Sequence, residues 1–291
     1  MPEGGLPHRP DFALPSVQGK ESRLTPLAAS ALAPALSQVL AATPSALITD
    51  IDGTISRIVA RPEDAGVSAV VRRSLETLAR RLALVAVVTA RDQATAVRMV
   101  GAEGITYVGN YGLEGGGLET GFAGAETEAR RLIQASPCVQ FEAKGVSFAL
   151  HYRNCDDPES VRRLLIEGLA PIAGRYGARL LEGKRVVELV PGSLPDKASA
   201  VLNLSRRHGL KGIVYFGDDL GDIPVFEALR RRREEEGLPG LAFAVVDAET
   251  DPSVSAAADG LIDGVDAVEA LLAELAATER WLPLRPGSGQ A

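Results

Sequence analysis

Carboxylates and a hydroxyl follow short apolar runs at three places in this chain. They are Asp50 with Asp52 after residues 46–49, Thr89 after residues 84–88, and Asp218 with Asp219 after residues 213–216. A carboxylate can attack phosphorus and form an aspartyl-phosphate, which divides one difficult displacement into two easier ones. A second carboxylate nearby can protonate the leaving alkoxide and later deprotonate a water molecule. These residue types therefore fit phosphoryl transfer.

The polar groups converge if the apolar runs are strands of one parallel sheet. Brief apolar runs are typical of buried strands, and in open parallel sheets ligands bind outside the carboxyl ends of the strands. A single Asp after a strand is usually a helix cap, and Asp-Gly is usually just a turn. Acids at two strand ends, a hydroxyl at another and a suitable lysine, Lys197, are much harder to explain as turns.

The same residues match the motifs of a known superfamily. The string Asp50-Ile51-Asp52-Gly53-Thr54 resembles the DxDGT signature of haloacid dehalogenase (HAD)-type phosphohydrolases. Thr89, Lys197 and the string Gly217-Asp218-Asp219 resemble its second, third and fourth motifs, in the family's order. The resemblance extends from about residue 45 to 275 and implies a magnesium-dependent phosphatase.

The resemblance implies a catalytic role for each motif residue. Asp50 is the nucleophile, and Asp52 is the general acid and base. Lys197 neutralises phosphoryl oxygens, while Thr89 and Thr54 donate hydrogen bonds to them.

A cation site is implied as well, because a dianionic phosphate beside several carboxylates needs a hard divalent ion such as Mg²⁺. By the resemblance, its ligands are the carboxylates of Asp50 and Asp218 and the backbone carbonyl of Asp52. Asp219 and Asp222 are expected either to bind the metal ion or to contact the residues that bind it.

Further strings resemble those of trehalose-6-phosphate phosphatases. They are Gly109-Asn110-Tyr111-Gly112-Leu113-Glu114 (GNHGxE in the family), Glu142-Ala143-Lys144-Gly145 with His151-Tyr152-Arg153 (ExK and HYR), and Gly183-Lys184 with Glu188 and Pro191 (GK, E and P). Carboxylates and amides bind vicinal sugar hydroxyls well, so the resemblance places several of these residues at the sugar and Arg153 nearer the phosphate. The predicted substrate-binding residues are Thr54, Arg91, Asn110, Glu114, Glu142, Lys144, Arg153, Lys184 and Glu188.

The chain departs from the family's strings at several positions. Thr89-Ala90-Arg91 stands where the family has SGR, which keeps a hydroxyl, and Tyr111 replaces the usual His. In the fourth motif, Gly221 replaces Thr and Ile223 replaces Glu. These differences concern the rim of the expected site more than its nucleophile.

The predicted function is hydrolysis of trehalose 6-phosphate to trehalose and phosphate through an aspartyl-phosphate. One alternative is a phosphatase for another sugar phosphate, and a second is a non-catalytic module that binds a sugar phosphate for regulation. The joint presence of Asp50, Asp52, Thr89, Lys197 and Asp218 favours an enzyme. A functional link to a separate trehalose-phosphate synthase would be a link between proteins.

Two hydrophobic patterns divide the chain. Strand-like and helix-like segments alternate over residues 46–108 and again over 195–279, which predicts a parallel sheet with helices on both faces. Residues 145–153 and 185–190 alternate apolar with polar side chains, which predicts antiparallel strands, with a helix over 161–176 between them. The expected fold is α/β, a Rossmann-like HAD core with an inserted α+β unit that resembles a C2-type cap.

The expected bounds of these units are 1–43 for an N-terminal tail and helix, 44–113 and 192–280 for the core, 114–191 for the cap, and 281–291 for a C-terminal tail. We expect the cap to close over the substrate by hinge motion near residues 112–116 and 190–195.

Composition narrows the classes of function. A net charge of −7 leaves the chain without the basic footprint of a nucleic-acid binder. Pro34 and Pro44 interrupt apolar residues 26–46, which argues against a membrane segment and predicts a short amphipathic helix. Cys138 and Cys155 form no CxxC pair, so we expect free thiols and a cytoplasmic protein. The Arg- and Glu-rich residues 230–236 are expected to form a solvated helix face.

Overall fold

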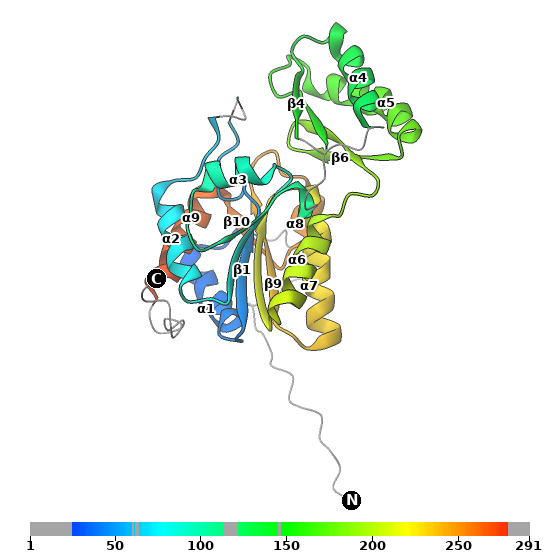
Figure 1. Ribbon diagram of the computed structural model, residues 1–291. Coiled ribbons are helices and arrows are strands. Elements are labelled where there is room, and N and C mark those ends of the chain that lie inside the picture. The colour runs from blue at the N-terminus through cyan, green and yellow to red at the C-terminus, as the bar shows by residue number, and fades with distance from the viewer. Residues whose placement is uncertain (1–24, 60, 62–63, 113–121, 145–146, 279–291) are drawn as a thin grey trace, which may run out of the picture.

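The computed structural model describes residues 25–59, 61, 64–112, 122–144 and 147–278. Within them the chain forms two sheets, one of six strands and one of four. Figure 1 shows the four-stranded sheet, in green, in a smaller body that lies beyond one end of the larger sheet.

The larger sheet is parallel throughout and has the strand order β10-β9-β8-β1-β2-β3. Its strands are β1 (Ser45–Thr49), β2 (Leu84–Val88), β3 (Thr106–Val108), β8 (Gly212–Gly217), β9 (Gly240–Val246) and β10 (Gly260–Asp263). Every residue of β1, β2 and β8 is buried. Burial of both strand faces is the pattern expected where helices cover both sides of a parallel sheet.

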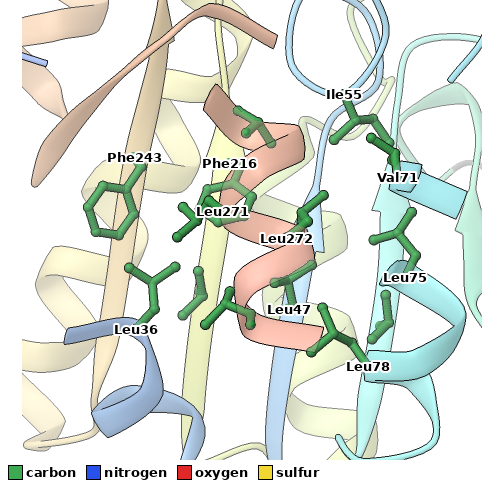
Figure 2. Packing of buried hydrophobic residues seen from close by; sticks show 14 of the residues in the cluster. Leu36, Leu47, Ile55, Val71, Leu75, Leu78, Phe216, Phe243, Leu271 and Leu272 are labelled. Carbon is green, nitrogen blue, oxygen red and sulfur yellow. The ribbon is translucent and has the colours of Figure 1, made fainter. Parts of the chain in front are cut away.

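Helices cover the first face of this sheet. They are α1 (Ala29–Leu40), α2 (Ala69–Ala79), α3 (Gln93–Val100) and α9 (Gly264–Ala277). Leu47 and Phe216 from the strands pack there in one cluster with Leu36, Leu75 and Leu271 from the helices. Figure 2 shows α9 lying between α1 and α2 in this cluster.

A second set of helices covers the opposite face. These helices are α6 (Lys197–His208), α7 (Ile223–Glu236) and α8 (Pro252–Ala257). Ile48 and Tyr215 pack here with Val201 and Phe226. Their chain neighbours Leu47 and Phe216 point to the first face, as alternation along a strand requires. The predicted parallel sheet with helices on both faces is therefore confirmed.

Strand register brings the ends of the central strands to one edge. Thr49 lies opposite Val87 of β2 and opposite Phe216 of β8. The backbone N–H of Asp50 extends this pairing by donating to the carbonyl of Phe216 at 2.9 Å. The residues that follow β1, β2 and β8 consequently emerge together.

The smaller body is the inserted α+β unit, and we call it the cap. Its antiparallel sheet has the order β4-β5-β7-β6, built from β4 (Gln140–Ala143), β5 (Phe148–His151), β6 (Ala178–Gly183) and β7 (Val186–Pro191). Helices α4 (Phe122–Leu132) and α5 (Pro158–Arg175) pack on one face of this sheet. Phe148 and Leu150 of β5 face these helices, so Ala149 and His151 face the other way.

Parts of the predicted organisation fall outside the described residues. The boundary between 113 and 114, and most of the hinge near 112–116, are among them, so the domain limits and the hinges stay predictions. The helix expected within residues 26–46 is α1, which contains Pro34. Of the helices the structure describes, none has the length and apolar character needed to cross a bilayer.

The prediction of two free thiols was wrong, because Cys138 and Cys155 form a disulfide in the cap. Cys138 lies just before β4 and Cys155 just after β5, and antiparallel pairing of these strands places Gln140 opposite His151. Residues far apart in sequence thereby come together at the open end of a hairpin, which the spacing of the cysteines alone did not indicate.

We expect loss of this disulfide to destabilise the cap. It closes a loop with a sequence separation of 17 residues, and a loop of that size is worth about 3 kcal/mol of unfolding free energy. Urea unfolding of Cys138→Ser, with Cys138→Ser/Cys155→Ser as its matched control, measures the loss. The two variants should agree, and midpoints equal to that of the oxidised wild type would contradict the expectation.

The prediction of a solvated face for residues 230–236 was also wrong in part. Arg232 is only 5% exposed and donates to the backbone carbonyl of Leu210. Arg233 pairs with Asp259 at 2.7 Å, between its Nη2 and the carboxylate Oδ1. Since α7 packs against the core, part of its cationic side ties neighbouring loops together instead of facing water.

Candidate active site

Asp50 and Lys197 form the buried centre of the site. Asp50 follows β1 and is 5% exposed, and Lys197 opens α6 and is 4% exposed. The Lys197 Nζ lies 3.1 Å from the Asp50 Oδ2 and 2.8 Å from the Asp222 Oδ1. The ammonium group therefore holds two carboxylates that come from the ends of different strands.

Asp222 is held by so many donors that it acts as an anchor. Its Oδ1 accepts from Lys197 and from the Tyr215 hydroxyl at 2.6 Å, and its Oδ2 accepts the backbone N–H groups of Asp218 and Asp219. Burial opposes its charge, but Lys197 and these hydrogen bonds outweigh burial and keep the pKa of Asp222 below its usual value. With its lone pairs engaged, Asp222 shapes the turn that presents Asp218.

Asp218 connects the core to the cap. It is 2% exposed, and its Oδ1 accepts from the Thr54 hydroxyl at 3.2 Å. Its Oδ2 lies 2.8 Å from the Nζ of Lys184, which stands in the turn between β6 and β7. Gly53 is required beside it, because a Cβ there would lie 2.0 Å from the Asp218 Oδ2 and the φ of Gly53 is +79°.

The acids at this edge fit a divalent cation. Carboxylate oxygens of Asp50, Asp218 and Asp222 lie within 4.8 Å of one another. Burial, only partly offset by Lys197, raises the pKa of Asp50 to about 8, and burial likewise raises that of Asp219 to about 6. Such shifts mark a site that needs more positive charge, and oxygen donors of this kind suit Mg²⁺.

The raised pKa of Asp50 predicts a pH dependence of stability in chelator. Between its unfolded value of 3.8 and about 8, the folded protein keeps a proton on Asp50 that the unfolded chain has lost. The contribution of Asp50 to unfolding free energy therefore falls as pH rises through this window. Asp50→Asn should lose stability less steeply between pH 5 and pH 8 than wild type in urea titrations. Equal slopes for the two proteins would contradict the assignment.

Asp52 lies at the mouth of the site, where Arg91 holds it. The Arg91 Nε and Nη2 donate to the Asp52 Oδ2 at 2.6 Å and Oδ1 at 2.9 Å, which is a bidentate fork. Thr89, 1% exposed, accepts the N–H of Arg91 on its Oγ1, so its hydroxyl hydrogen remains to be donated.

Residues of the cap complete the wall opposite the core. Glu188 is 6% exposed and accepts from Ser147 at 2.6 Å, from Lys144 at 2.8 Å and from the Tyr111 hydroxyl at 3.4 Å. Tyr111 belongs to the core, so its contact with Glu188 crosses between the two bodies. Burial raises the pKa of Tyr111, and its hydroxyl therefore acts as a donor.

One cavity of about 150 Å³ gathers most of the predicted site. Its lining includes Asp50, Asp52, Thr89, Arg91, Glu142, Lys144, Arg153, Lys184, Glu188, Lys197, Asp218 and Asp219. The structure therefore brings together, in one cavity, residues that lie far apart in the sequence.

Other predicted residues lie elsewhere. Thr54 is fully buried, and its hydroxyl donates a hydrogen bond to Asp218. Thr54 therefore positions this carboxylate and does not line the cavity. Asn110 has a φ of 49°, and its buried Oδ1 has no hydrogen-bond partner among the residues that the structure describes; it is not among the residues that line the cavity. Glu114 lies outside the described residues.

The cavity lining also includes Tyr111 and His151, for which the sequence predicted no role. Tyr111 was treated as a replaced His, yet its hydroxyl reaches Glu188. His151 lines the cavity, and its Nε2 lies 2.7 Å from the Glu142 Oε2. The signal for His151 was present in the alternation of residues 145–153, which puts His151 on the face opposite Phe148 and Leu150.

Comparison with known proteins agrees with this arrangement. The family model described as trehalose-phosphatase matches residues 48–117 and 124–258, more than half of the chain. A trehalose-phosphate phosphatase of Mycolicibacterium paratuberculosis is 34% identical over 212 residues, which cover 66% of this chain and 53% of that protein. One from Mycobacterium tuberculosis is 30% identical over 240 residues, covering 75% and 60%. The chain thus spans little more than half the length of these two relatives.

A solved structure shows the same fold. The C-terminal domain of trehalose-6-phosphate phosphatase from C. albicans superposes with a TM-score of 0.75 at 20% identity, over 88% of this chain and 99% of that one. Since the family model covers both the core motifs and the cap, the chain belongs to the trehalose-phosphatase family.

Proposed function

We propose that this protein hydrolyses trehalose 6-phosphate to trehalose and inorganic phosphate. The observation that carries the proposal is one cavity in which Asp50, paired with Lys197, and Asp52, held by Arg91, face charged and polar side chains of the cap. Family membership supports the same substrate.

The proposed reaction has two displacements at phosphorus. An Asp50 oxygen bonds to phosphorus while the bond from phosphorus to the sugar oxygen breaks, and Asp52 gives that oxygen a proton. Asp52 then takes a proton from water, the water oxygen bonds to phosphorus, and the Asp50–phosphorus linkage breaks. Lys197 and the Thr89 hydroxyl stabilise the phosphoryl oxygens throughout.

Mg²⁺ is the proposed cofactor. Asp50 and Asp218 would hold it, with the backbone carbonyl of Asp52 and with Asp219 nearby. When bound, it neutralises charge shared by the phosphoryl group and the carboxylates. Asp222 is left out of this ligand set, because Lys197, Tyr215 and two backbone N–H groups use its oxygens.

The proposed sugar contacts come from the cap. Glu142, Lys144 and Glu188 stand on the sheet face that looks into the cavity, and Lys184 and Arg153 reach it from its edge. Glu142 is a suitable acceptor for hydroxyls, since His151, Lys144 and Arg91 outweigh burial and lower its pKa to about 2. The roles of Asn110 and Glu114 in sugar binding stay predictions.

A different sugar phosphate is the main competing substrate. Tyr111 favours it, because a phenol bonded to Glu188 stands where the family's string has a His. A non-catalytic sugar-phosphate-binding module is a second competitor, and it would bind the same ligands without turnover.

We also propose a cytoplasmic location and a functional link to a separate trehalose-phosphate synthase that would supply the substrate. The disulfide between Cys138 and Cys155 stands against the cytoplasm, because disulfides persist mainly in oxidising compartments. Trapping of thiols in intact cells, followed by fractionation, would show whether the protein lies in the cytoplasm with free cysteines or in an oxidising compartment with the disulfide formed.

The test of the proposed function is phosphate release from a panel of sugar phosphates, with Mg²⁺ and with chelator. We expect Mg²⁺-dependent turnover that is fastest on trehalose 6-phosphate. Faster turnover of another sugar phosphate would select the first competitor. Stabilisation by sugar phosphates without phosphate release from any of them would select the binding module.

A further inference from the structure

His151 occupies a defined place on the cap face that looks toward the core. It ends β5 opposite Gln140, while Glu142 lies opposite Ala149, so His151 and Glu142 are diagonal neighbours on the same face. The His151 Nε2 lies 2.7 Å from the Glu142 Oε2, and the two side chains are 26% and 22% exposed. This contact engages only one of the two oxygens of Glu142.

The other oxygen of Glu142 faces the core. Its Oε1 lies 3.6 Å from the Arg91 Nη1, while the Nε and Nη2 of the same guanidinium form the fork on Asp52. Arg91 is therefore shared between Asp52 of the core and Glu142 of the cap. An unbroken series of contacts runs from His151 through Glu142 and Arg91 to Asp52.

This series has a geometric consequence for Asp52. A guanidinium is planar, and its bidentate fork fixes the plane of the carboxylate that it holds. The Arg91 side chain is 12% exposed, and Glu142 is the acid on its remaining edge. A Glu142 carboxylate free to rotate would also be drawn to Lys144, the ammonium group that helps to keep it ionised.

We propose that His151 is a positioning residue for the general acid: it holds Glu142 against Arg91, and Arg91 in turn fixes the orientation of Asp52. The inference rests on the proposed function, in which Asp52 protonates the leaving oxygen. By this inference a residue of the cap affects the rate of leaving-group protonation, whereas a role of His151 in sugar binding alone would leave that rate unchanged.

Two aryl phosphates without a sugar test the inference. Phenyl phosphate has a poor leaving group that needs a proton, and 4-nitrophenyl phosphate has a good one that leaves without it. The value of kcat/KM covers only the steps up to departure of the alcohol, so later hydrolysis of the aspartyl-phosphate does not affect the comparison. The same folded protein cleaves both esters at the same phosphate site, so the ratio of the two kcat/KM values is not changed by partial misfolding.

We expect His151→Leu to lower kcat/KM for phenyl phosphate about tenfold and for 4-nitrophenyl phosphate less than about twofold. A loss of this size is smaller than the 10²–10⁴-fold contribution typical of a general acid itself. His151→Gln, which keeps an N–H donor for Glu142, should restore most of the ratio. His208→Leu, at an exposed position in the last turn of α6, is the matched control and should resemble wild type.

Other results would overturn the inference. Equal losses on the two esters would assign His151 to binding or to the cap fold, and wild-type values in His151→Leu would remove its role. A Gln variant as impaired as the Leu variant would exclude the hydrogen bond as the cause. If wild-type protein with Mg²⁺ releases phosphate from no sugar phosphate, the proposed function fails and this inference with it, whereas preference for another sugar phosphate leaves the inference standing.

Discussion

Asp50→Asn is expected to reduce phosphate release at least about 10⁴-fold, because the amide cannot form an acyl phosphate and loss of a nucleophile is among the costliest changes in a hydrolase. The two side chains have nearly the same shape, and Asp50 is buried among partners, so the fold should survive. The loss should appear in kcat, measured with the preferred sugar phosphate and Mg²⁺.

The same variant should still bind substrate. Lys197, Thr89 and the cap residues remain in place, and one source of negative charge beside the phosphate is gone. Calorimetric titration with trehalose 6-phosphate should therefore give binding without heat from turnover. Asp266→Asn, an exposed acid whose side chain is 76% accessible, is the matched control and should keep wild-type activity. More than about one hundredth of wild-type activity in Asp50→Asn would point to another nucleophile.

The core of the site could be predicted because its residues follow directly from the strands. Asp50 and Thr89 come directly after short, largely apolar runs, and parallel pairing then leaves them at one edge of the sheet. Local pattern is sufficient for this step, since all the strands concerned are buried on both faces. Further along the core, β10 has four residues and α8 has six, which is too few to give a periodic signal.

The cap was harder to predict because its elements depend on tertiary pairing. β4 and β6 have half-exposed or exposed residues throughout and no clear apolar run. They are strands because β5 and β7 offer them hydrogen-bonding partners. Contacts such as that between Lys184 and Asp218 join the core and the cap. No local sequence pattern predicts them, because the two residues lie far apart in the chain.

The fourth motif shows why spacing does not assign roles among neighbouring acids. Asp218, Asp219 and Asp222 all lie near a strand end, and the sequence left open whether Asp222 joins a metal site. The 3-10 helix Leu220–Asp222 has a capping box in which Asp219 and Asp222 bond to each other's backbone. That turn directs Asp222 back toward Lys197 and leaves Asp218 facing the cavity.

Lys197→Met is the second change with a large expected effect, here on the folded state. The ammonium group lies 3.1 Å from Asp50, 2.8 Å from Asp222 and 3.9 Å from Asp219. Burial opposes its charge, but Asp222 and Asp50 outweigh burial and raise the pKa of Lys197 well above its usual value. Met fills a similar volume and leaves these buried carboxylates without their cation.

We expect the unfolding free energy of Lys197→Met in chelator at pH 8 to fall by about 3–5 kcal/mol, the typical cost of removing one partner of a buried ion pair. Lys211→Met, at an exposed position after α6, should change it by less than about 0.5 kcal/mol. Urea titration of both variants measures the difference.

The deficit of Lys197→Met should shrink as the pH is lowered. In wild type the raised pKa of Lys197 keeps its stabilising charge fully present below pH 10.5, and the lowered pKa of Asp222 keeps that ion pair intact between pH 5 and pH 8. In the variant, the abandoned carboxylates can lose their charge only by binding protons, and they do so more readily at pH 5 than at pH 8. A deficit that is the same at the two pH values would mean that lost packing, and not uncompensated charge, is what destabilises the variant.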